Sequence, residues 1–88
     1  MSDYTQKLNY TQEHSDEIQA TIRRVYCSLL EKGYSPILQL SGYILTGDPT
    51  YITNHNHARQ IIQRVDRDTL LQALVQGYLK DVESDKRW

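Results

Sequence analysis

The sequence has few of the residues that small domains use as cross-links. Cys27 is the only cysteine among 88 residues, which excludes an internal disulfide and fits a reducing compartment. Apolar runs are also short, well below the roughly 20 residues that span a bilayer, and the first residues are polar. The sequence therefore indicates neither export nor membrane insertion, and we expect a cytoplasmic protein.

An excess of charge of either sign is missing as well. Ten Lys and Arg residues against eleven Asp and Glu give a formal net charge of −1, which leaves no overall field to attract nucleic acid. What is present is a hydrophobic content of 39%, enough for one small domain. A domain of this size buries only about 60% of its unfolded surface, so a single copy without cross-links is marginally stable. Self-association is therefore expected.

Hydrophobic periodicity divides the chain into a flexible N-terminal arm (1–14), a helical domain (15–82) and a polar C-terminal tail (83–88). Ser15 or Asp16 is suited to cap a first helix over about 16–32, which Gly33 can end by taking positive φ. The apolar residues of this helix recur on one side at helical spacing: Ile18, Ile22, Val25, Tyr26, Leu29 and Leu30.

A second helix is predicted over 36–46, because Ser35 can cap it and Pro36 suits its first turn. Apolar residues cover more than half of its circumference, so we expect it to be the buried central element. Ser41 and Gly42 are small residues on apolar arcs, and they should let another helix backbone come close.

Two further helices are predicted after a break. Gly47, followed by Asp48-Pro49, ends the second helix, and residues 50–53 form a short extended link. Asn54 or Asn56 can cap the third helix. The apolar residues of that helix again share one face: Ala58, Ile61, Ile62 and Val65.

The fourth helix is predicted to begin at Asp66 or Asp68, and its apolar face covers about 180° instead of the usual 100°. That face comprises Leu70, Leu71, Leu74, Val75, Tyr78, Leu79 and Val82. The fold class is therefore all-α, a compact bundle of four main helices with room for a fifth short one. Because one copy cannot cover all this apolar surface, we predict a homodimer joined through the second and fourth helices. Its candidate interface is Leu38, Ser41, Gly42, Leu45, Leu71, Val75, Tyr78 and Leu79.

No residue pattern predicts a reaction centre, so no enzyme, metal or cofactor is expected. His55 and His57 stand at i, i+2, which points them to different sides of a helix, so structural capping is favoured over metal binding. Ser41 has no adjacent base that would activate it. Each of three aspartates stands where a cap or turn favours one: Asp48, Asp66 and Asp68. Four tyrosines are expected in the core or an interface: Tyr34, Tyr43, Tyr51 and Tyr78.

The third and fourth helices resemble a helix-turn-helix in outline, so DNA binding is the alternative interpretation. This arrangement would bring together Arg59, Arg64 and Arg67, which make a thin basic patch. The fourth helix is apolar over half its face, so packing is favoured over insertion into a DNA groove, and nucleic acid is not an expected partner. Cys27 borders the first apolar stripe, where we expect a buried, unreactive thiol.

The segment between Glu31 and Arg59 carries many fixed spacings. Its notable residues are Glu31, Lys32, Gly33, Tyr34, Pro36, Ile37, Gln39, Gly42, Tyr43, Gly47, Asp48, Pro49, Tyr51, Ile52, His55, Asn56, Ala58 and Arg59. This pattern resembles the IreB family of small bacterial regulatory phosphoproteins. Weaker similarity continues through Arg67-Asp68, Leu74-Val75 and Tyr78-Leu79, so that the resemblance covers roughly two thirds of the chain.

The resemblance implies a helical, dimeric and non-catalytic regulator in cell-envelope stress signalling. It implies phosphorylation of an N-terminal threonine by a membrane-bound Ser/Thr kinase, reversed by a phosphatase, with a downstream protein target that the sequence does not name. Lys7 stands where the family often has threonine, so Thr5 is the nearest candidate acceptor and Thr11 the second. A phosphate adds about −1.5 to −2 charge and could recruit exposed arginines such as Arg23 or Arg24. The sequence suggests no role for the terminal Trp88.

Overall fold

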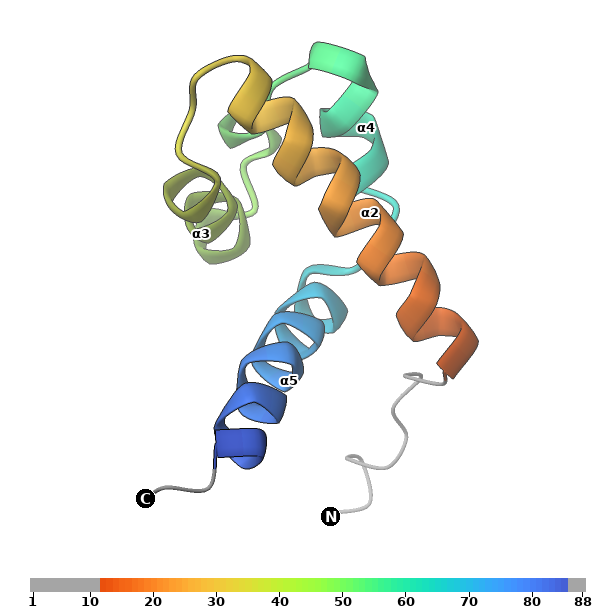
Figure 1. Ribbon diagram of the computed structural model, residues 1–88. Coiled ribbons are helices and arrows are strands. Elements are labelled where there is room, and N and C mark those ends of the chain that lie inside the picture. Colours follow the sequence, from red (N-terminus) through yellow and green to blue (C-terminus); the bar gives the residue numbers. More distant parts are fainter. Residues whose placement is uncertain (1–11, 86–88) are drawn as a thin grey trace.

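The computed structural model describes residues 12–85, and the regular elements in this range are helical. They are α2 (Gln12–Glu31), α3 (Pro36–Thr46), the 3₁₀ turns η1 (Pro49–Tyr51) and η2 (His55–His57), α4 (Ala58–Ile62) and α5 (Arg67–Asp85). In Figure 1, α2 runs through the molecule beside α3 and α4, and α5 extends away from them. The predicted all-α fold with four main helices and short extra turns is confirmed.

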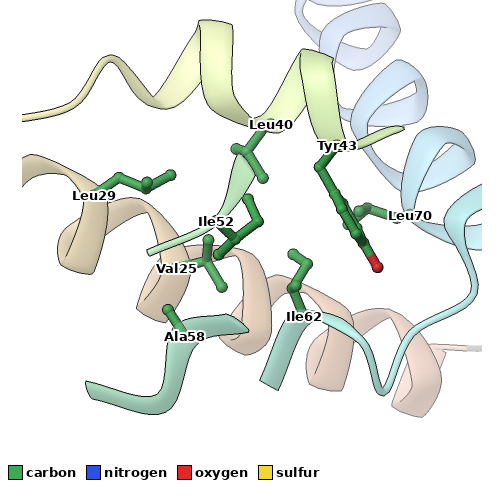
Figure 2. Close-up of a cluster of buried hydrophobic side chains, with 8 residues drawn as sticks. All are labelled: Val25, Leu29, Leu40, Tyr43, Ile52, Ala58, Ile62 and Leu70. Atoms are coloured by element: carbon green, nitrogen blue, oxygen red, sulfur yellow. The ribbon is translucent and has the colours of Figure 1, made fainter. Parts of the chain in front are cut away.

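The hydrophobic core lies where the four helices meet. Its buried side chains come from α2, α3, α4, α5 and the segment between η1 and η2, and they converge in Figure 2: Val25, Leu29, Leu40, Tyr43, Ile52, Ala58, Ile62 and Leu70. Ile18 and Ile61 are also buried. Because α2 contacts each of α3, α4 and α5, it is the central element of the fold.

The first helix begins earlier than predicted. Because α2 starts at Gln12, Ser15 and Asp16 lie inside it and neither is its N-cap. Glutamine and glutamate are good helix formers, so Gln12 and Glu13 suit a helix despite the capping signal that follows. The predicted stop is correct: Gly33 has φ 82°, and the N–H of Tyr34 donates to the Leu29 carbonyl at 2.9 Å.

The second helix has the predicted bounds but not the predicted burial. The Ser35 hydroxyl accepts the Leu38 N–H at 3.3 Å, and Gly47 ends the helix with φ 77°. Leu40 and Tyr43 are buried, whereas Ile37 is 76% and Leu45 83% exposed. The expectation of a buried central helix is therefore wrong in this single chain, because only one side of α3 meets the core.

The segment after α3 is more tightly turned than predicted. Residues 49–51 form a 3₁₀ turn, and Ile52 adopts the extended conformation that was expected for all of 50–53. Asn54 makes no side-chain cap, and Asn56 and His57 take positive φ of 55° and 62°. The predicted asparagine caps are therefore wrong. The backbone reverses sharply before α4, a helix of only five residues whose apolar pattern continues past its end to Val65.

The last helix starts beside the predicted aspartates. The Leu70 N–H donates to the main-chain carbonyl of Asp66 at 2.9 Å, and the Asp68 carboxylate accepts the Thr69 N–H at 2.8 Å. The helix extends to Asp85, beyond the predicted end near Val82. None of the helices formed by residues 12–85 is both long and apolar enough to cross a membrane.

Candidate functional site

Two rows of apolar side chains remain exposed, and we call them the exposed apolar rows. The row on α3 contains Ile37, Leu38 and Leu45, and the row on α5 contains Leu71, Val75, Tyr78 and Leu79. The most exposed residue of the α3 row is Leu45 at 83%, and that of the α5 row is Tyr78 at 70%. In Figure 1 the C-terminal half of α5, which contains Tyr78 and Leu79, projects beyond the other helices, so this part of the row has no neighbouring helix to cover it. Apolar side chains gathered in this way are typical of surfaces that bind another protein.

The predicted interface residues divide into two environments. Leu38, Ser41 and Leu45 are exposed and share a face of α3 at i, i+3 and i+7. Gly42 instead lies under the ring of Tyr51, since a Cβ built at Gly42 would be 2.5 Å from Cε1 of that ring. The close approach expected at Gly42 therefore occurs, but its neighbour is an aromatic side chain instead of a helix backbone.

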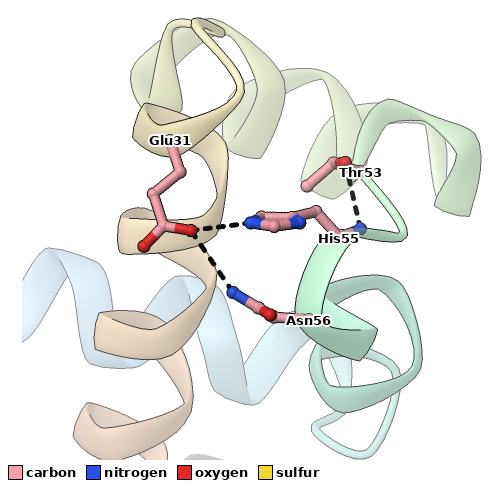
Figure 3. Close-up of polar contacts among 4 residues, drawn as sticks. All are labelled: Glu31, Thr53, His55 and Asn56. Atoms are coloured by element: carbon pink, nitrogen blue, oxygen red, sulfur yellow. Dashed lines mark hydrogen bonds and ion pairs between the residues drawn. The ribbon is translucent and has the colours of Figure 1, made fainter.

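A polar junction connects η2 to the end of α2 (Figure 3). Oε1 of Glu31 lies 2.6 Å from Nε2 of His55 and accepts a weaker hydrogen bond of 3.4 Å from the Asn56 amide. The N–H of His55 donates to the Thr53 hydroxyl at 3.2 Å. His55 thus has a structural role in holding η2 against α2. Among the described residues, no group of three or more His, Cys, Asp or Glu side chains could hold a metal ion.

Asp48 has the turn role that was predicted. Its Oδ1 accepts the Thr50 hydroxyl at 2.7 Å and the Thr50 N–H at 3.0 Å. These hydrogen bonds hold the pKa of Asp48 below its ordinary value of 3.8, and the bond from the Thr50 hydroxyl has the larger effect. Thr46 completes the turn, since its Oγ1 accepts the Asp48 N–H at 3.0 Å. The carboxylate is therefore used to shape the chain between α3 and η1.

Two of the three arginines of the predicted basic patch bind the main chain of this protein. Nε of Arg59 donates to the Ile52 carbonyl at 2.8 Å, and Nη1 of Arg67 donates to the Ile44 carbonyl at 2.9 Å. Arg59 is partly buried by this contact, so it does not contribute to an open basic patch. These arginines join neighbouring segments of the fold, which removes most of the support for the DNA-binding interpretation.

A second surface feature was not predicted from the sequence. We call it the basic hollow, a depression lined by Ala20, Arg23, Arg24, Cys27, Ser28, Asn56 and His57. The predicted burial of Cys27 is wrong, since its side chain is exposed and the neighbouring Ser28 is the buried one, at 3%. The spacing of residues 20, 23, 24 and 27 places them on one helix face. That signal was available, but only the folded chain places η2 beside them.

The remaining predicted residues have varied positions. Thr5 and Thr11 lie outside the described residues. Among the motif residues Tyr43 is buried and Pro36 and Gln39 are half-buried, whereas Tyr34 and Tyr51 are exposed, as is Tyr78 of the fourth helix. Most motif residues therefore have identifiable structural positions, at turns, caps and packing contacts.

Comparison with protein families gives one match that spans most of the chain. Residues 3–80 match the family described as IreB regulatory phosphoprotein. The matched range includes Thr5 and Thr11, every described turn between α2 and α5, and all of the two exposed apolar rows. Because this match covers far more than half of the chain, the chain belongs to the IreB family of regulatory phosphoproteins.

Proposed function

We propose that this regulatory phosphoprotein is a non-catalytic cytoplasmic substrate of a membrane-bound Ser/Thr kinase and its phosphatase in cell-envelope stress signalling. The family match over residues 3–80 is the observation that supports this proposal most strongly. Both candidate acceptors fall within the match. Thr5 is the preferred acceptor because it is closest to the position where the family often carries threonine, with Thr11 second.

The proposed working form is a homodimer that uses the exposed apolar rows. Leu38 is 68% and Leu79 54% exposed in the single chain, and burying such side chains stabilises an association by about 25 cal/mol for each Å² of apolar surface removed from water. A two-fold contact would let the same rows cover each other in both copies. Any apolar surface left outside the dimer would be available to a downstream protein.

The kinase proposal is tested by incubating the full chain with the kinase domain and ATP and mapping phosphate by mass spectrometry. We expect phosphate on Thr5, lost in Thr5→Ala, retained in Thr11→Ala and removed by the phosphatase. Phosphate on Thr11 alone would show that Thr11 is the acceptor and Thr5 is not. The absence of phosphate from every hydroxyl would contradict the kinase-substrate role. The dimer is tested separately by sedimentation equilibrium at micromolar concentration, where a monomer would contradict it.

A further inference from the structure

The basic hollow gathers several cationic and amide donors on an accessible surface. Arg23 and Arg24 are exposed on the same face of α2, and within residues 15–83 no ion pair engages either guanidinium. Asn56 and His57 form the opposite side of the hollow. On this side Oε1 of Glu31 lies 2.6 Å from Nε2 of His55, so this carboxylate already has a partner.

This set of side chains matches the chemistry of a phosphate group. Guanidinium groups bind phosphate oxygens through paired N–H donors, and such charge-assisted hydrogen bonds are about twice as strong as neutral ones. Nδ1 of His57 lies 3.2 Å from Oε1 of Gln60, a contact that holds the ring beside the hollow. The hollow thus offers a phosphate the two guanidinium cations of Arg23 and Arg24.

We infer that the basic hollow binds the phosphate of phosphothreonine at position 5 of the same chain and thereby docks the N-terminal arm along α2. The inference rests on the proposed phosphorylation of Thr5. Phosphorylation would then act on the protein through a defined contact: an unmodified threonine offers one hydroxyl, whereas its phosphate offers three acceptor oxygens and about two negative charges to Arg23 and Arg24.

The length of the arm distinguishes the two candidate acceptors. Arg23 lies about 17 Å, and Cys27 about 22 Å, along the helix axis from Gln12 at 1.5 Å per residue. The chain from Thr5 to Gln12 can extend over about 24 Å, so a phosphate on Thr5 can return to the hollow. Thr11 directly precedes the first residue of α2 and lacks this reach. The geometry therefore assigns the docking role to Thr5 alone.

The test uses full-length protein in which phosphothreonine is incorporated directly at position 5 during translation, so that no kinase is needed. Phosphorus NMR then follows the second ionisation of the phosphate. We expect its pKa to fall by at least about half a unit relative to the chain unfolded in urea, a roughly threefold change in the dissociation constant, because nearby arginines stabilise the dianion. Arg23→Gln/Arg24→Gln should abolish the fall.

Two controls make the result specific. Arg64→Gln removes an exposed arginine outside the hollow and should leave the fall intact. Phosphothreonine at position 11 adjoins the N-terminus of α2, which itself stabilises a phosphate dianion, so any fall in its pKa should persist in Arg23→Gln/Arg24→Gln. The inference would be overturned if the phosphate at position 5 had the same pKa in the folded and the unfolded chain. It would also be overturned if the lowered pKa persisted in Arg23→Gln/Arg24→Gln while the circular dichroism was unchanged. Because the modification is installed directly, failure of docking and failure of the kinase to modify Thr5 are separate results.

Discussion

The ring of Tyr51 occupies the space in which a side chain at Gly42 would begin. The two residues lie on α3 and η1, and a Cβ at Gly42 would be 2.5 Å from Cε1 and 2.6 Å from Cδ1 of the ring. Carbon atoms pack at about 3.5 to 4.0 Å, so no methyl group fits without displacing the ring. The glycine is therefore needed for space, and its contact with Tyr51 positions η1 on α3.

Gly42→Ala is expected to destabilise the protein by about 1–2 kcal/mol, since the overpacking cost exceeds the helix-propensity gain of about 1 kcal/mol. Gly77→Ala on α5 is the matched control, because a Cβ there meets nothing within 4 Å. It should stabilise by about 0.5–1 kcal/mol. Urea unfolding measures both. In a Tyr51→Ala background, Gly42→Ala should become stabilising, and a cost that persists there would contradict the steric explanation.

The two glycines that end helices should differ in their tolerance of alanine. Gly33 and Gly47 both have positive φ, which costs an alanine roughly 1–2 kcal/mol. A Cβ at Gly33 meets nothing, whereas one at Gly47 would lie 2.9 Å from Cζ of Arg67. Gly47→Ala should therefore cost more than Gly33→Ala, because it also disturbs the Arg67 hydrogen bond to Ile44. Equal losses of unfolding free energy would show that Arg67 moves aside freely.

Lowering the pH should remove the contribution of Asp48 to the stability of the folded state. Its lowered pKa means that the folded state prefers the carboxylate, so this stabilisation is complete above the ordinary pKa of 3.8 and is lost as pH falls through the lowered folded-state value. Asp48→Asn keeps a capping oxygen but does not titrate. The stability difference between wild type and Asp48→Asn should be constant from about pH 7 to pH 5 and shrink below that. A difference that does not vary with pH would refute this role.

Buried and exposed isoleucines provide a test of the core. Ile52 is 0% exposed and Ile37 is 76% exposed. Ile52→Ala should cost about 2–5 kcal/mol through lost burial and a cavity. Ile37→Ala should stay within about 0.5 kcal/mol in the dissociated chain, where this side chain is uncovered. Both are measured by urea unfolding at one protein concentration low enough to dissociate the dimer, since an association makes stability depend on concentration. A large cost at Ile37 under these conditions would contradict its exposed position in the single chain.

Charges placed in the exposed apolar rows should weaken the proposed dimer without unfolding the chain. Leu45→Glu and Leu79→Glu replace side chains that are already 83% and 54% exposed, so each chain should keep its helical circular dichroism. A carboxylate buried in an interface without a partner is strongly unfavourable, so the dissociation constant should rise by at least tenfold. Gln19→Glu on the exposed side of α2 adds the same charge as a control. Equal effects of all three variants would contradict the proposed interface.

The most accurate sequence predictions concern the helix ends that depend on local backbone chemistry. Gly33, Ser35, Pro36 and Gly47 defined α3 to the residue, because positive φ, a capping hydroxyl and a missing N–H act within a few positions of the chain. The start of α2 was harder to locate. The residues before Ser15 suit a helix as well as a loop, and capping preference alone does not decide between them.

The surface was less predictable than the helices. Periodicity grouped the apolar residues of α3, yet it could not show that Leu40 and Tyr43 would be buried, with Ile44 packed against the core and the others exposed. It also grouped Arg59 into a basic patch and placed Cys27 in the interior, because the surroundings of each residue depend on segments that fold back from elsewhere in the chain. The basic hollow has the same origin, since Asn56 and His57 join Arg23 and Arg24 only after η2 has packed on α2.

The amino-acid order by itself determined the helical class, the termini of α3 and the apolar stripe of α2, since these follow from dihedral preferences and a period of 3.6 residues. The tertiary structure alone decided which helix is central, which apolar rows stay uncovered and which charged side chains meet. Those outcomes depend on distances between residues remote in sequence, such as Glu31 and His55, and packing sets these distances only when the whole chain is folded.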